Sequence, residues 1–160
     1  MRGRAKGFTL IELMTVVAIV GVLAAIGTGA YQHYFGRSQL VEPLALAGPA
    51  RAAVAEYFGH TGRLPADNAA AGLQPPERYA GRRLASLEVE RGAIHLHLND
   101  RGQPGLRGRV LSLRPAWRPD GRDGRLLWLC GTARPPGDGW VVAGVDRTDV
   151  PVRLLPPSCR

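Results

Sequence analysis

The sequence lacks the motifs that mark the common enzyme classes. No serine nucleophile elbow, phosphate-binding P-loop or pair of catalytic carboxylates is found in its 160 residues. The spacing of an EF-hand calcium loop is absent as well, and no internal repeat is visible. We therefore predict a protein that is not an enzyme and that requires no cofactor.

Lysine is almost absent, because only Lys6 accompanies the arginines among the 21 cationic residues. The 13 acidic residues leave a formal net charge of +8. Three of the cations, Arg2, Arg4 and Lys6, precede a long apolar run without any acidic residue between them. The remaining excess lies in the C-terminal half, where a mildly basic surface could attract nucleic acid or another anionic surface.

Histidine is scarce, and one close pair could in principle bind a metal ion. His95 and His97 lie two residues apart on an expected strand, so they share one face, but no third ligand follows nearby. The carboxylates of the loop 119–124 and of Asp146 and Asp149 could bind calcium, although six or more oxygens would be needed. We expect the two histidines to lie on a solvated strand face and predict no metal site.

Cysteine occurs only twice, at Cys130 and Cys159. In an exported domain an even number of cysteines suggests a disulfide. The closed loop would hold 28 intervening residues, and closing it stabilises the fold by about 3–4 kcal/mol in the chain-entropy model. Two free buried thiols are the alternative.

The longest apolar run spans residues 8–30 and contains a single charge, Glu12. As a helix this run would be about 34 Å long, enough to cross the core of a bilayer. The cations before it predict a cytoplasmic N-terminus, with the rest of the chain on the outer side. A secretory signal cleaved near Ala24-Ala25 is the alternative.

Glu12 is unexpected in such a segment. A carboxylate within a membrane helix costs up to about 2.5–3.5 kcal/mol on insertion scales. A passive anchor has no reason to carry this residue, so the sequence predicts a partner for it.

The segment MRGRAKGFTLIELMTVVAIVGVLAAI resembles the N-terminus of type IV prepilins. The resemblance implies that prepilin peptidase cuts after Gly7 and methylates the new amine of Phe8, so that the apolar helix is retained. It also implies that Glu12 pairs with the N-terminal amine of a neighbouring subunit. The family usually has a proline at the position of Gly29, where this chain has Gly27-Thr28-Gly29, a helix-weakening alternative.

The remaining chain predicts an α+β domain. We expect an amphipathic helix half over 31–59, a connecting αβ-loop over 60–83 and an antiparallel sheet in 84–160. Pro43 and Gly48-Pro49 should kink the helix or break it into two pieces, and glycine at 59–62 should end it. The segment ARAAVAEYFGHTGRLPADN resembles the end of this helix in type IVa pilins.

Alternating apolar residues predict the strands. A hairpin is expected over 86–90 and 94–98 with its turn at Arg91-Gly92, then a third strand over 110–113 that Pro115 ends. A fourth strand is expected over 126–130, and 140–145 could add a short one. The predicted fold is a long N-terminal helix, with a transmembrane N-half, packed on a small antiparallel sheet of about four strands. The resemblance adds a disulfide-closed C-terminal D-region.

The resemblance implies a structural subunit of a type IV pilus, similar to a type IVa major pilin. Such a subunit is held in the inner membrane by a single span and then polymerises into an extracellular filament. Its partners would be other pilin subunits, prepilin peptidase and the pilus assembly machinery. Twitching motility, cell adhesion and DNA uptake follow from the family.

Two alternatives remain at the level of sequence. One is a low-abundance minor pilin that binds DNA through a basic surface around Trp117, although a merely soluble basic surface is favoured. Its possible DNA contacts are Arg107, Arg109, Arg114 and Arg118. The other is a type II secretion pseudopilin, against which the Cys130 and Cys159 pair argues, because the major pseudopilin usually relies on calcium.

Overall fold

The computed structural model describes residues 9–101, 104–121 and 125–160, and of residues 27–38 it describes the backbone alone. The chain forms two compact units, Met1–Phe35 and Gly36–Arg160. In chain order the elements are α1 (Leu10–Ser38), α2 (Val41–Thr61), the 3-10 helix η1 (Pro76–Tyr79), β1 (Leu84–Glu90), β2 (Ala93–Leu98), β3 (Val110–Trp117), β4 (Leu127–Cys130), β5 (Val141–Val142), and the 3-10 helices η2 (Val152–Leu154) and η3 (Pro157–Cys159).

Helix α1 begins with a side-chain cap. The Glu12 backbone N–H donates to Thr9 Oγ1 at 3.3 Å, and the Leu13 N–H donates to the Thr9 carbonyl at 3.2 Å. A threonine followed three residues later by a glutamate is a typical helix start. The helix continues through Gly27 and Gly29, so the glycine pair is helical here.

Within the described residues, no helix combines the length and the apolar character that crossing a bilayer requires. The predicted span over 8–30 extends beyond the side chains that the structure describes. Membrane insertion of this segment stays a prediction.

The predicted interruption of the helix is confirmed, but it lies just before the first proline. A two-residue turn at Gln39 and Leu40 separates α1 from α2, and Pro43 occupies the first turn of α2. A proline ring crowds the carbonyl four residues earlier, here that of Gln39, and has no N–H to donate to it, which favours a break at this point. Pro49 remains inside α2, and Gly62 ends this helix in a left-handed conformation with φ 66°.

The five strands form one antiparallel sheet in the order β1-β2-β3-β4, with β5 paired to the end of β3. The predicted hairpin is confirmed, since β1 and β2 pair from Glu90↔Ala93 onwards. Its turn residues Arg91 and Gly92 have φ of 48° and 83°. Two successive positive φ values match the twist of a tight hairpin.

The prediction that Pro115 ends the third strand is wrong, because β3 continues to Trp117. The Pro115 carbonyl accepts a hydrogen bond from the Ala143 N–H at 3.0 Å. The N–H group that the proline lacks would point to the same side of β3 as this carbonyl. On that side β2 begins only at Ala93, so it does not reach the position opposite Pro115. A proline is tolerated in a strand where no neighbouring carbonyl needs its donor.

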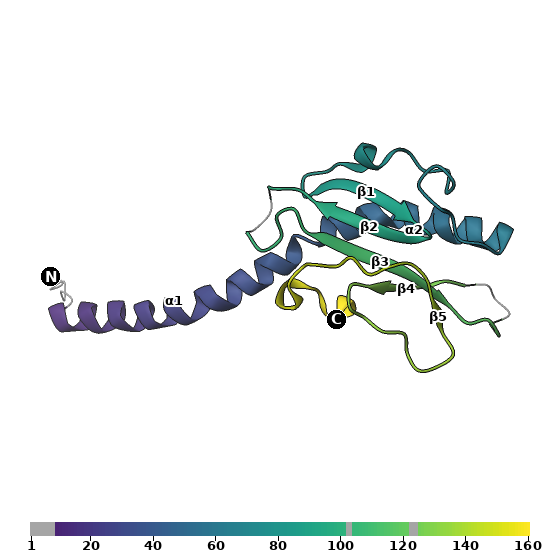
Figure 1. Cartoon of the computed structure of the whole chain (residues 1–160). Helices are drawn as coiled ribbons and strands as arrows, with labels where there is room; N and C mark the ends of the chain where they lie inside the picture. The colour runs from purple at the N-terminus through teal and green to yellow at the C-terminus, as the bar shows by residue number, and fades with distance from the viewer. Residues whose placement is uncertain (1–8, 102–103, 122–124) are drawn as a thin grey trace, which may run out of the picture. The chain divides into compact units, whose positions relative to one another are not determined.

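The core of the second unit lies between α2 and one face of the sheet. Small residues of α2 line the contact, and Figure 1 shows α2 behind the strands. The core residues contributed by α2, β1, β2 and β3 are Ala47, Ala50, Val54, Leu84, Leu87, Val89, Ile94, Leu96, Leu98, Leu111 and Leu113. Val41, which the helical periodicity assigns to this face, is instead 63% exposed.

The other face of the sheet is not solvated around His95, contrary to expectation. The side chain of His95 is fully buried, with Nδ1 2.9 Å from Ser112 Oγ. The Arg147 N–H donates to the same Ser112 Oγ at 2.9 Å, and a Cβ at Gly144 would come within 2.4 Å of the Ala93 Cβ. The segment 143–149 thus covers His95, a contact that strand periodicity does not reveal.

Candidate functional site

Helix α1 carries most of the large apolar side chains that are exposed among the described residues. Its large apolar side chains between Leu10 and Ile26 are each at least 49% exposed. They are Leu10, Ile11, Leu13, Met14, Val16, Val17, Ile19, Val20, Val22, Leu23 and Ile26. A contiguous apolar surface of this kind marks a site that another protein or a membrane covers.

Glu12 lies in the first turn of this helix and is exposed. Among the described residues its carboxylate has no hydrogen bond or ion pair, although its backbone N–H is capped by Thr9. A carboxylate is favoured near the positive N-terminal end of a helix. The predicted processing residues Gly7 and Phe8 lie outside the described residues.

The predicted disulfide joins Cys130, at the end of β4, to Cys159 in η3, with 4.4 Å between the two Cα atoms. The Thr132 N–H donates to the Cys159 carbonyl at 3.1 Å, so the bridge is supported by the backbone. A Cβ at Gly131 would lie 2.7 Å from that carbonyl oxygen. Glycine is required there, because the C-terminal segment approaches the strand end too closely for a side chain.

Three of the four arginines predicted as possible DNA contacts are engaged with groups of the chain itself. Arg109 Nη1 lies 3.2 Å from Asp149 Oδ2. Arg114 Nη2 donates to the Gly131 carbonyl at 3.2 Å and lies 3.8 Å from Asp146 Oδ2. Internal pairing of this kind reduces the charge available to phosphates.

The third, Arg118, donates to both carboxylate oxygens of Asp120 at 3.2 Å. These side-chain hydrogen bonds and the charge of Arg118 lower the pKa of Asp120. The fourth arginine, Arg107, is exposed and also has an interaction partner. The arginines predicted as possible DNA contacts are therefore not free cations, and DNA binding by them stays a prediction.

The connecting loop is attached to the sheet through Asn68, whose role the sequence did not reveal. Its Nδ2 donates to the Leu87 and Gln74 carbonyls at 3.0 Å, and its Oδ1 accepts the Val89 N–H at 2.6 Å. The side-chain amide takes the place of a neighbouring strand along the outer edge of β1. A single asparagine in a long loop carries no signal of this function.

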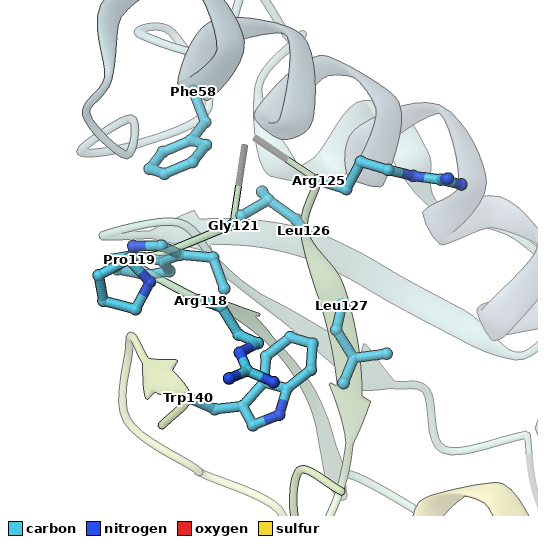
Figure 2. A pocket seen from close by; sticks show the side chains of 9 residues that line it. Phe58, Arg118, Pro119, Gly121, Arg125, Leu126, Leu127 and Trp140 are labelled. Atoms are coloured by element: carbon cyan, nitrogen blue, oxygen red, sulfur yellow. The ribbon is translucent and has the colours of Figure 1, made fainter. Parts of the chain in front are cut away.

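An aromatic groove opens at the end of α2, beside the β3–β4 loop. It encloses about 580 Å³ and is lined by Phe58, Trp117, Arg118, Pro119, Gly121, Arg125, Leu126, Leu127 and Trp140. The Phe58 and Trp117 rings are tilted with their centroids 5.2 Å apart. Figure 2 shows Phe58 and Trp140 on opposite sides of the groove, with Arg118 beside Trp140.

The described residues contain no group of three or more His, Cys, Asp or Glu side chains arranged to hold a metal ion. His97 Nε2 instead lies 3.2 Å from Glu88 Oε2, and His95 Nε2 lies 3.5 Å from Glu90 Oε2. Burial, and next the nearby charge of Arg147, lower the pKa of His95.

Comparison with known proteins places two families along the chain. The family of bacterial filament pilins matches residues 36–160, and the prokaryotic N-terminal methylation motif matches residues 2–28. The chain is 40% identical to the type IV major pilin protein PilE1 of Neisseria gonorrhoeae, covering 97% of this chain and 87% of that protein. It is 37% identical to the fimbrial protein EcpC of Eikenella corrodens (97% and 90%) and 35% identical to a fimbrial protein of Neisseria meningitidis (97% and 94%).

Proposed function

This chain belongs to the pilin family and is a structural subunit of a type IV pilus, and we propose that it polymerises through the apolar surface of α1 after cleavage between Gly7 and Phe8. The subunits of the surface filament are other copies of the chain. The observation that supports this proposal is the exposure of the large apolar side chains of α1 from Leu10 to Ile26. Packing these helices against one another removes that surface from water, which is the main favourable term in association.

Glu12 sets the register of this packing in our proposal. A carboxylate among packed apolar helices is costly unless it meets a cation. The free amine that cleavage creates at Phe8 is such a cation, and the same chain carries no other charge between residues 8 and 30. The register in which a neighbouring subunit places its amine at Glu12 is therefore more stable than a register in which that helix is shifted along its axis.

Before assembly the subunit is held in the inner membrane by residues 8–30, with its N-terminus in the cytoplasm. The cations Arg2, Arg4 and Lys6 ahead of the apolar run and the methylation motif over 2–28 support this arrangement. Prepilin peptidase and the pilus assembly machinery are the partners at this stage. We propose adhesion and twitching motility as roles of the filament, and no catalytic role for the chain.

The DNA-binding minor pilin is not favoured, because relatives over nearly the whole chain are major pilins. The internal pairing of Arg109, Arg114 and Arg118 argues in the same direction. The pseudopilin alternative is not favoured either, since the chain carries the Cys130–Cys159 bridge.

Mass spectrometry of sheared surface filaments tests the proposal. We expect this chain as a main component, with Phe8 as its methylated first residue. Gly7→Val should leave the leader attached and abolish the filaments, whereas the matched control Gly3→Val should be processed normally. Filaments lacking this chain, or containing it with Met1 or with an N-terminus beyond Ile26, would overturn the proposal.

A further inference from the structure

One end of the second unit is formed by four segments that are distant in the sequence. They are the turn before α2, the turn before β1, the loop between β2 and β3, and η2 with the residues before it. Gln39, Arg83 and Leu106 line one small hollow, and a Cβ at Gly105 would lie 2.9 Å from Leu154 Cδ1. Figure 1 shows the start of α2 and the loop between β2 and β3 at one end of the sheet, and the β1–β2 turn at the other. We call this the entry end, because the chain enters the second unit there, and it comprises residues 39–42, 80–83, 99–101, 104–109 and 149–154.

The entry end carries an excess of positive charge. Its arginines are Arg82, Arg83, Arg101, Arg107, Arg109 and Arg153, and its acidic residues are Glu42, Asp100 and Asp149, which leaves a net charge of +3. At the opposite end, the segment 59–67 meets the β1–β2 turn, where the Arg91 N–H donates to the Ala66 carbonyl at 2.9 Å. These two segments hold Arg63, Arg91 and Asp67, a net charge of +1. The entry end is therefore the more basic of the two.

Two of the acids at the entry end are engaged with the backbone. Glu42 Oε1 accepts the N–H groups of Arg82 and Arg83 at 2.6 and 3.2 Å. Asp149 Oδ1 accepts the Val110 N–H at 2.6 Å. Such charge-assisted hydrogen bonds fix the position of a carboxylate. These acids therefore cannot move to pair with arginines elsewhere on the surface.

Three arginines of the entry end remain open to solvent beside apolar side chains. The Arg82 side chain is 80% exposed, although its Nε lies 3.7 Å from Glu42 Oε2. Arg101 and Arg153 are exposed, and among the described residues their guanidinium groups have no ion pair. Val41 and Val152 are 63% and 55% exposed. Guanidinium groups bind phosphates, and apolar side chains next to cations are typical of surfaces that lie on a bilayer.

The length of the link to the apolar run favours a bilayer over nucleic acid as the partner. In the proposed function, on which this inference rests, residues 8–30 lie in the membrane. Residues 31–39 then join the membrane to the entry end, and α1 continues to Ser38, so the link is about 13 Å long. Even a fully extended link would reach only about 32 Å. The entry end thus stays close to the bilayer whatever the angle between the two units.

We propose that, while the subunit is held in the membrane, the entry end docks on the surface of a bilayer that contains anionic phospholipids. Arg82, Arg101 and Arg153 bind the phosphate groups, and Val41 and Val152 enter the boundary between headgroups and acyl chains. An arginine near an anionic membrane surface contributes roughly fivefold in affinity, and salt screens this attraction. The contact is therefore reversible and is released when the subunit leaves the membrane for the filament.

Arginine footprinting of the full chain in nanodiscs tests this contact. Phenylglyoxal, which modifies exposed guanidinium groups, is applied in bilayers of phosphatidylcholine with or without phosphatidylglycerol, and mass spectrometry gives the rate at each arginine. Arg82, Arg101 and Arg153 should react several-fold more slowly with phosphatidylglycerol present. About 1 M salt, at which the Debye length is about 3 Å, should restore the faster rates. Arg63 and Arg91, the internal controls at the opposite end, should react equally in both bilayers.

Equal rates in the two bilayers, or equal slowing at both ends of the second unit, would overturn the contact. Slowing of the three arginines by added duplex DNA but not by phosphatidylglycerol would also overturn it, because the surface would then bind nucleic acid. A chain that does not enter the bilayer at all would instead refute the membrane stage of the proposed function.

Charge reversal locates the contact on the entry end. Arg101→Glu with Arg153→Glu should restore the fast reaction of Arg82 in the phosphatidylglycerol bilayer. The matched control, Arg63→Glu with Arg91→Glu, reverses two exposed arginines at the opposite end and should leave Arg82 slow. An unchanged midpoint of urea denaturation confirms that each variant is folded. A slow reaction of Arg82 in the first variant, or a fast reaction in both, would refute the contact.

Discussion

Arg147 Nη2 lies 2.6 Å from Glu90 Oε2, and this ion pair connects the segment 143–149 to β1, the first strand of the sheet. Arg147 Nη1 also lies 3.4 Å from Glu88 Oε2. Both pairs cross from the C-terminal part of the chain to a strand more than fifty positions earlier. Together they hold the covering segment over the buried side chain of His95.

This arrangement predicts a loss of stability at acidic pH. Burial lowers the pKa of His95 below its usual value of 6.5, and the charge of Arg147 lowers it further. His97 also lowers this pKa, whereas the carboxylates of Glu88 and Glu90 raise it. A lowered pKa in the folded state means that the unfolded chain binds the proton first. The contribution of neutral His95 is therefore complete above pH 6.5 and is lost as the pH falls below it, by about 1.4 kcal/mol for each pKa unit of the shift.

Urea denaturation of the detergent-solubilised protein at pH 7.5 and pH 5.5 measures this effect. The stability lost between the two pH values should be smaller in His95→Gln than in the wild type. The control His60→Gln changes an exposed histidine at the end of α2 and should behave as the wild type does. An unchanged pH dependence in His95→Gln would contradict the assignment.

The Cys130–Cys159 bridge should limit opening of the segment between the two cysteines. Reduction releases a loop of 28 intervening residues, and the chain-entropy model assigns about 3–4 kcal/mol to its closure. We expect trypsin to cleave after Arg147 and Arg153, two exposed arginines between the cysteines, faster in reductant than without it. The variant Cys130→Ser with Cys159→Ser should be cleaved at the fast rate in both conditions, and equal rates for the wild type would argue against a structural bridge.

Asn68→Ala should destabilise the second unit and release the connecting loop. The buried Val89 N–H and the Leu87 carbonyl would lose their partner, and each unsatisfied group costs about 1–3 kcal/mol. Hydrogen exchange of the Val89 amide should be faster than in the wild type, and the midpoint of urea denaturation should be lower. Gln74→Ala, at an exposed position in the same loop, should change neither quantity. Wild-type stability of Asn68→Ala would show that the edge of β1 does not depend on this amide.

Glu12→Ala should leave export and processing intact but reduce assembly, because the amine at Phe8 of a neighbouring subunit would lose its partner. The measurement is the yield of sheared filaments at equal amounts of processed subunit. Glu12→Gln should be impaired as well, since it keeps the size of the side chain and removes its charge. Glu56→Ala, which removes an exposed acid of α2, is the control. A normal yield from Glu12→Ala would remove Glu12 from the assembly mechanism.

Local patterns in the sequence predicted α1 with Glu12 in its first turn, the hairpin around Arg91-Gly92 and the bridge between Cys130 and Cys159. Each of these depends on the properties of neighbouring residues or on a simple pair of cysteines. The helix break also follows from Pro43. The break lies at Gln39 because the proline ring crowds the carbonyl four residues earlier.

The sequence by itself therefore determined the apolar helix, the alternating strands and the family membership that these features imply. Only the tertiary structure decided that His95 is buried, that β3 continues through Pro115 and that Asn68 covers the edge of β1. Each of these outcomes depends on a segment distant along the chain that supplies a cover or a partner. Periodicity describes which face a residue lies on, whereas burial depends on what the rest of the chain places over that face.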